Sequence, residues 1–138
     1  MLQTRAGYKV CRLTGTTLTS TNNLIVSALR CTYTMGRITS QPANSGALAV
    51  FEVYTDSVEF IKTQIPVGTY VICSIAYVPT DDIMWYELDG ERVYLAQRTI
   101  PNGTHYASSV LIVSTVSQFK VKIDENGRYK LSAQPLEV

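Results

Sequence analysis

The sequence has few of the residues on which metal, disulfide and catalytic sites depend. Its 138 residues include one histidine, one tryptophan and three cysteines. Metal sites usually show closely spaced cysteine or histidine pairs, and short secreted chains with disulfides usually show an even cysteine count. Cys11, Cys31 and Cys73 fit neither pattern. We therefore expect three reduced, mostly buried thiols, with no metal site and no cofactor.

Charge is also scarce. Charged residues make up 17% of the chain and the formal net charge is +1, whereas soluble domains average about 25% charged residues. The 12 basic residues are scattered along the sequence. They form no basic patch of the kind that attracts nucleic acid or an anionic membrane. We expect neither nucleic acid nor a membrane among the partners.

Long apolar runs are absent as well. No stretch approaches the roughly 20 apolar residues that a helix needs to cross a bilayer. The first ten residues, MLQTRAGYKV, lack the apolar core of a signal peptide. We expect no transmembrane segment and no secretion signal, and the sequence leaves the cellular location open.

The sequence does contain a succession of strand patterns. Segments rich in Val, Ile, Tyr and Thr alternate with turn residues, which is typical of β-strands joined by tight connections. The predicted strands cover residues 8–14, 24–35, 47–54, 70–78, 83–88, 91–100, 110–123 and 129–132. We predict one all-β domain over residues 1–138, built from short antiparallel strands.

One part of this prediction has two readings. Residues 21–33, TNNLIVSALRCTY, contain candidate helix caps and a helical spacing of Leu24, Ala28 and Cys31. Their β-branched and aromatic content favours a strand, with a helix as the alternative. We expect at most one helix in the protein, at this segment. The Thr/Ser/Asn-rich stretch 15–23 before it is interpreted as a loop.

The run WYELDGERVYLA, residues 85–96, is the most regular pattern in the chain. Asp89-Gly90 predicts a two-residue hairpin turn, because a type I′ turn needs positive φ at both central positions. Counting outward, the facing pairs are Leu88 with Glu91, Glu87 with Arg92, Tyr86 with Val93, Trp85 with Tyr94 and Met84 with Leu95. Side-chain alternation then gives a core face and a partly wet face. The wet face carries Trp85, Tyr94, Glu87 and Arg92.

The surrounding segment carries a resemblance. It reads Ile65-Pro-Val-Gly68-Thr-Tyr-Val71, then Met84-Trp85-Tyr86, Asp89-Gly90 and Arg92-Val-Tyr94-Leu-Ala96. This order resembles the bacterial SH3-like (SH3b) domain, in the cell-wall-targeting variety of phage endolysins and lysostaphin-like bacteriocins. The resemblance implies a small SH3-like barrel or sandwich with its core at residues 47–100. Residues 1–46 and 101–138 would then be extensions with additional N- and C-terminal strands, packed on that core.

The resemblance also implies a ligand. In this family an aromatic groove binds a short peptide of the bacterial cell wall. The corresponding residues here are Trp85, Tyr94, Glu87 and Arg92, with Tyr54 and Tyr77 lining the same groove. The alternative is that neighbouring strands or the C-terminal extension cover this face, so that these side chains stabilise the fold.

No catalytic constellation is visible. His105 follows a predicted turn at 101–104 without a nucleophile motif beside it, and Asp81-Asp82 is interpreted as a solvated loop. We therefore expect a non-catalytic binding module for bacterial cell-wall peptide, or for a protein partner. The alternative is a self-assembling structural or assembly protein of a phage or virus particle, such as a virion or tail component, whose sheets pack against its own copies.

Overall fold

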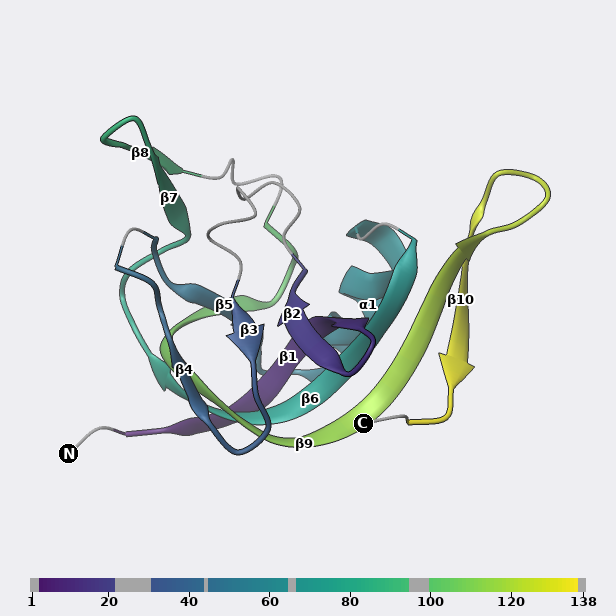
Figure 1. The fold of residues 1–138 in the computed structure, drawn as a ribbon, viewed down its shortest axis with the longest axis horizontal. Coiled ribbons are helices and arrows are strands. Elements are labelled where there is room, and N and C mark those ends of the chain that lie inside the picture. Colours follow the sequence, from purple (N-terminus) through teal and green to yellow (C-terminus); the bar gives the residue numbers. More distant parts are fainter. Residues whose placement is uncertain (1–2, 22–30, 44, 65–66, 95–99, 137–138) are drawn as a thin grey trace.

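The computed structural model describes residues 3–21, 31–43, 45–64, 67–94 and 100–136 (Figure 1). Most of them lie in strands, and the described residues include one helix. The predicted all-β class is therefore confirmed. In the same part of the chain, the helix is too short and polar to cross a membrane.

The pairings between the strands named below, all within the described residues, are antiparallel, also as predicted. The elements are β1 (Arg5–Thr14), β2 (Thr17–Ser20), β3 (Thr32–Tyr33), β4 (Ile38–Ser40), β5 (Leu48–Phe51), α1 (Tyr54–Gln64), β6 (Gly68–Pro79), β7 (Trp85–Leu88), β8 (Glu91–Tyr94), β9 (Thr104–Ile123) and β10 (Tyr129–Gln134). Eight strands form one sheet, and β7 and β8 form a second. Most strands are short, but β6 has 12 residues and β9 has 20.

The large sheet closes on itself as a small barrel. β6 pairs with β1 and with β9, and β5 also pairs with both β1 and β9. This cycle of pairings leaves a closed interior, as in other small barrels. The interior apolar residues, here named the barrel core, are Cys11, Leu13, Leu18, Tyr33, Leu48, Val50, Val71, Cys73, Ile75, Tyr77, Ala107, Val110 and Ile112.

A second apolar cluster lies on the other face of the sheet, beneath α1. Its buried members, here named the helix-side core, are Val10, Phe51, Ile61, Tyr70, Ile72 and Val121. Neighbouring residues of β1 and β6 therefore contribute to opposite clusters, as strand alternation requires. The sheet is thus buried on both faces where α1 covers it.

Strand β9 bends because it carries surplus residues opposite β6. Val113 lies between two residues that pair with consecutive residues of β6, so it has no partner there, and Val116 and Ser108 are surplus in the same way. Each is a β-bulge, which bends a strand and increases its twist. Figure 1 shows β9 sweeping in a broad curve along the barrel. The bulges let one strand contribute to the barrel core at its start and to the helix-side core at its end.

The position of the helix corrects the sequence prediction. We predicted a strand up to Tyr54 and a helix, if any, at residues 21–33. Instead Tyr54, Val58 and Ile61 share one face of α1, with Ile61 buried in the helix-side core. Residues 22–30 lie outside the described residues, and Thr32–Tyr33 is strand β3.

In the large sheet, strand β6 of the predicted core at 47–100 pairs with strands from both predicted extensions. The partners of β6 are β1, from the N-terminal segment, and β9, from the C-terminal segment. The three parts of the chain are therefore interleaved in one barrel. Strand β2 also lies within the stretch 15–23 that we interpreted as a loop, and β4 lies between the predicted strands 24–35 and 47–54.

Candidate functional site

The β7–β8 hairpin has the predicted register. Trp85 faces Tyr94 and Glu87 faces Arg92. Asp89 has φ 52° and Gly90 has φ 82°, as a type I′ turn requires. The turn and the pairing are therefore confirmed.

The turn gives a first testable prediction. Gly90→Val should destabilise the hairpin by roughly 1–2 kcal/mol or more, the cost of holding an L-residue in the left-handed region. A Cβ at Gly90 would meet no atom within 4 Å, so the cost is conformational alone. Denaturant unfolding of Gly90→Val beside Asp89→Asn, which tolerates the same region, would measure it. Equal stability of the two variants would contradict the type I′ geometry.

Trp85 is buried, which corrects the predicted exposed platform. Its side chain is only 7% exposed. The indole Nε1 donates to the Asp82 carboxylate at 3.3 Å, and the Arg92 guanidinium carbon lies 4.0 Å above the ring centroid. Gly46 closes the remaining side, since a Cβ there would lie 2.4 Å from the indole Cδ1. The tryptophan therefore anchors the hairpin to the barrel.

The backbone reinforces this anchor. The Gly46 N–H donates to the Trp85 carbonyl at 2.8 Å, and the Ala47 N–H donates to the Ile83 carbonyl at 3.0 Å. Asp82 accepts a bond from the Gln41 amide at 3.4 Å as well. Asp82 lies in a loop, as predicted, but its carboxylate holds two parts of the chain together.

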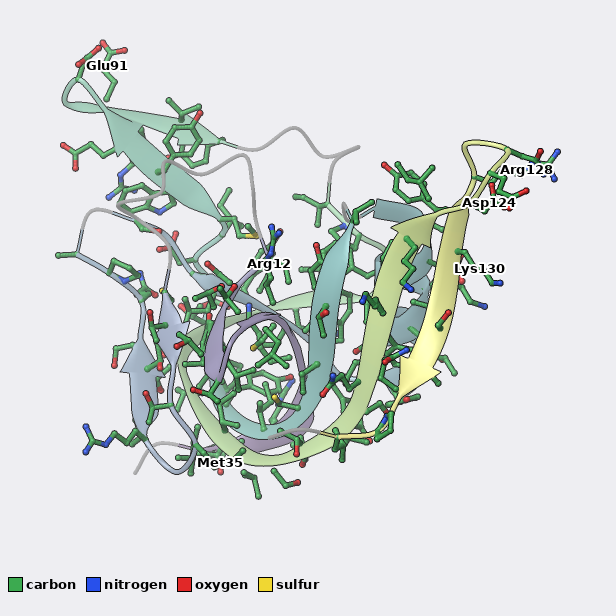
Figure 2. All side chains as sticks on the ribbon, turned by 45° about the vertical axis from the view of Figure 1, so that its right-hand side comes forward. Arg12, Met35, Glu91, Asp124, Arg128 and Lys130 are labelled. Carbon is green, nitrogen blue, oxygen red and sulfur yellow. The ribbon has the colours of Figure 1, made fainter. Side chains whose placement is uncertain are left out.

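The other predicted members of the platform lie nearer to solvent. Tyr94 is 53% exposed, and Glu87 and Arg92 are exposed. Figure 2 shows the hairpin projecting from the body of the molecule, with Glu91 at its tip. What remains of the predicted platform is one open tyrosine beside a guanidinium that packs on a buried indole.

Tyr54 and Tyr77 do not line a groove with this hairpin or with each other. Tyr77 belongs to the barrel core and is 1% exposed. Tyr54 packs against the helix-side core, its ring edge-on to Tyr8 at 5.6 Å, and its hydroxyl is hydrogen-bonded to Ser117 Oγ at 2.6 Å. The two tyrosines therefore serve opposite faces of the sheet, and the predicted common groove is wrong.

A polar cluster that sequence reasoning missed surrounds Glu52. Its Oε1 accepts a hydrogen bond from the Tyr77 hydroxyl at 2.6 Å. Arg5 Nη1 lies 3.5 Å from the same oxygen, and His105 Nδ1 lies 3.7 Å from it. His105, which follows the predicted turn at 101–104, is in strand β9 opposite Val50. Here, strand pairing joins residues from three distant parts of the sequence.

The cluster shifts the pKa values of its members. The hydrogen bond from Tyr77, with smaller contributions from His105 and Arg5, lowers the pKa of Glu52. Burial, then the hydrogen bond to Glu52, raises the pKa of Tyr77 to about 12. A carboxylate is thus held ionised, and a phenol neutral, at the barrel wall.

An open depression of about 640 Å³ lies beside this cluster, lined by Arg5, Tyr77, Asp81, His105, Tyr106 and neighbouring residues. The Arg5 guanidinium, the His105 imidazole and the Asp81 carboxylate can hold a small polar group there by charge and hydrogen bonds. Among the described residues, no serine or cysteine lines it. Within the described ranges, no group of three or more histidine, cysteine or acidic side chains could hold a metal ion.

Tyr77→Phe tests the polar cluster. Removing the hydroxyl removes the bond that favours the Glu52 carboxylate, so the pKa of Glu52 should rise. A depressed carboxyl pKa stabilises the fold above its unfolded value of about 4.3, and this contribution is lost as the pH falls through the folded pKa. The difference in unfolding free energy between the wild type and Tyr77→Phe should therefore decrease as the pH falls. Carboxyl NMR titration measures the pKa, and an unchanged value would contradict the assignment.

The barrel core contains an unusual charged group. Lys9 is 7% exposed; its Nζ donates to the Ala49 carbonyl at 2.5 Å and lies 5.3 Å from the Tyr33 ring centroid. Burial lowers its pKa. Cys73 faces it across the strands, and Cys11, Cys31 and Cys73 are all free thiols, with two of them buried. This agrees with the expectation of reduced, mostly buried cysteines.

Comparison with known proteins gives no relative. No family model matches the chain, and searches of curated proteins and of solved structures find no match. The function must therefore be argued from the surface itself.

Proposed function

We infer a function from the β9–β10 hairpin, which carries an apolar face that α1 covers only in part. Three facing pairs share it: Phe119 with Ala133, Val121 with Leu131 and Ile123 with Tyr129. Val121 is 2% exposed and packs in the helix-side core. The outermost pair, Ile123 and Tyr129, is 55% and 61% exposed. The apolar face that begins in the helix-side core thus continues into solvent-exposed surface along the β9–β10 hairpin, the arm at the right of Figure 1.

We propose that the protein is a non-catalytic, self-assembling structural protein, of the kind that builds a phage or virus particle. The observation that carries this proposal is the uncovered Ile123–Tyr129 pair. An exposed apolar surface continuous with a core marks a contact site for another chain. Ile38 and Val113, 69% and 56% exposed, add apolar side chains on strands β4 and β9.

The strand edges support the same proposal. Among the described residues, β10 pairs only with β9 and β8 pairs only with β7. An unpaired edge strand is a template for pairing with another chain. A subunit with such edges on projecting hairpins is suited to contact its copies.

The mass in solution tests this function. Light scattering or sedimentation over a concentration series should show species above 15.3 kDa. Ile123→Ser/Tyr129→Ser should weaken self-association at least about tenfold, as expected when the centre of an interface is removed. The control is Val53→Ser, since Val53 is similarly exposed, at 52%, but lies outside the hairpin. A wild-type monomer at all concentrations would overturn the proposal.

Binding of bacterial cell-wall peptide, as the SH3b resemblance implies, is the second candidate. It is favoured by the open tyrosine Tyr94 beside Arg92 on a projecting hairpin. Co-sedimentation with purified cell walls should then be reduced by Tyr94→Ala and left unchanged by Tyr129→Ser. The absence of any co-sedimentation would remove this candidate.

A further inference from the structure

The β9–β10 hairpin has a basic face opposite its apolar face. Lys120, Lys122 and Lys130 alternate with the apolar residues of the two strands, and Lys122 faces Lys130 directly. Like charges facing each other across a strand pair are destabilising. Among the residues that the structure describes, these lysines make no ion pair. The arm is therefore a basic surface.

The acidic groups at the end of this arm offset its charge only in part, since Asp124 and Glu125 are outnumbered by Lys120, Lys122, Arg128 and Lys130. Asp124 is engaged in the turn, where its Oδ1 accepts the N–H groups of Asn126 and Arg128 at 2.9 Å each. Arg128 adds a further positive charge beside Glu125. Figure 2 shows Asp124 and Arg128 at the tip and Lys130 on the side of the strand.

The β7–β8 hairpin has the opposite charge. Residues 81–91 contain Asp81, Asp82, Glu87, Asp89 and Glu91 and no basic residue. Arg92, the nearest cation in the sequence, lies over the Trp85 ring. Against the effect of burial, hydrogen bonds from Ile83, Gln41 and Trp85, and then the charge of Arg92, lower the pKa of Asp82 at the base of the hairpin. Glu87, Asp89 and Glu91 remain exposed towards the tip.

The two hairpins lie at opposite sides of the molecule. Figure 1 shows β7–β8 at the upper left and β9–β10 at the right, separated by the barrel and α1. The oppositely charged hairpins therefore do not contact each other within one chain. Complementary patches on different faces of one molecule produce head-to-tail contacts, which build rings or filaments.

We propose that copies of this chain join head to tail, with strand β10 of one copy pairing along strand β8 of the next. This inference rests on the proposed self-assembly and names its surfaces. On one face of the joined sheet Lys130 would approach Glu91. On the other, Tyr129 would approach Tyr94. Both tyrosines are more than half exposed, at 61% and 53%, so the contact combines charge pairing with apolar burial.

Charge reversal tests the pairing. Variant A carries Lys120→Glu, Lys122→Glu and Lys130→Glu, and variant B carries Glu87→Lys and Glu91→Lys. Each variant alone presents two surfaces of like charge, so its self-association should weaken at least tenfold. An equimolar mixture of A and B restores opposite charges at every contact and should assemble again. Circular dichroism of each variant verifies folding, and Lys62→Glu and Glu59→Lys on α1 are the matched controls.

The outcomes separate this inference from the function on which it rests. A wild-type monomer would overturn both. Wild-type assembly that variants A and B retain would leave self-assembly standing and overturn the hairpin contact. Weakened variants that fail to assemble when mixed would overturn it as well. Sedimentation velocity at low and high salt should also show weaker wild-type assembly as salt screens the charges.

Discussion

Replacing Trp85 by alanine is expected to lower the free energy of unfolding by about 3–5 kcal/mol, the usual cost of truncating a buried aromatic side chain. The indole is 7% exposed, it donates to Asp82, and it fills the space that Gly46 leaves open. Its loss would open a cavity between the hairpin and the barrel, and would leave Arg92 without its stacking partner.

Tyr94 provides the matched control because it faces Trp85 directly and is 53% exposed. Tyr94→Ala should cost less than about 1 kcal/mol, as for most exposed positions. Urea unfolding of both variants measures the difference. Similar losses for both would show that Trp85 is not packed as described, and would return it to the exposed platform that the sequence suggested.

Deleting Phe119 from β9 should abolish folding. The deletion shifts the alternation of every later residue of the strand. Lys120 and Lys122 would then take the positions of Phe119 and Val121 against α1, and Val121 would turn towards solvent. Burying two unpaired charges costs several kcal/mol for each, which is comparable with a typical total stability of about 5–15 kcal/mol.

Deleting Val113 should be much milder. Val113 is the unpaired residue of a bulge, so its removal leaves its neighbours on the same partners and faces. The deletion costs stability only through the lost bend of β9, because the side chains that follow keep their inward or outward orientation. The two deletions can be compared by circular dichroism and thermal unfolding. Equal loss of structure would contradict the bulge assignment.

The sequence predicted local structure where a chemical signal was strong. Asp89-Gly90 specified a turn, and the register of the hairpin followed by counting. The same holds for the predicted strands 110–123 and 129–132, which lie in β9 and β10. In each case the deciding interactions lie within a few residues along the chain.

The helix was missed because its composition concealed its spacing. Residues 54–64, YTDSVEFIKTQ, contain Val, Ile, Phe and Thr, which favour strands. The period of Tyr54, Val58 and Ile61 is helical, and Pro66 follows where a helix must end. Attention to that spacing would have placed α1.

The candidate site was less accessible from the sequence. Pairing of β5, β1 and β9 brings Glu52, Arg5 and His105 together, and no short sequence motif indicates that they meet. The sequence of β9 was also hard to interpret. Because of the bulges, its inward-facing residues lie two or three positions apart, so the strand does not show a regular alternation of apolar and polar residues. The inward-facing residues are Ala107, Val110, Ile112, Thr115 and Gln118. Trp85 was paired with the correct partner, Tyr94, but was assigned to the wet face, because the loop that buries it, near Gly46, is distant in sequence.

The central position of β9 also governs how the chain can fold. This strand pairs with β4, β5, β6 and β10, yet it comes after nearly three-quarters of the residues. Until it is made and docked, three earlier strands lack a neighbour and the barrel stays open. Most contacts thus join residues that are far apart in the sequence. Such contacts slow folding and leave unpaired, aggregation-prone strand edges exposed while it proceeds. During synthesis, the unpaired strands of an incomplete chain would be able to pair with other copies until β9 and β10 have been made.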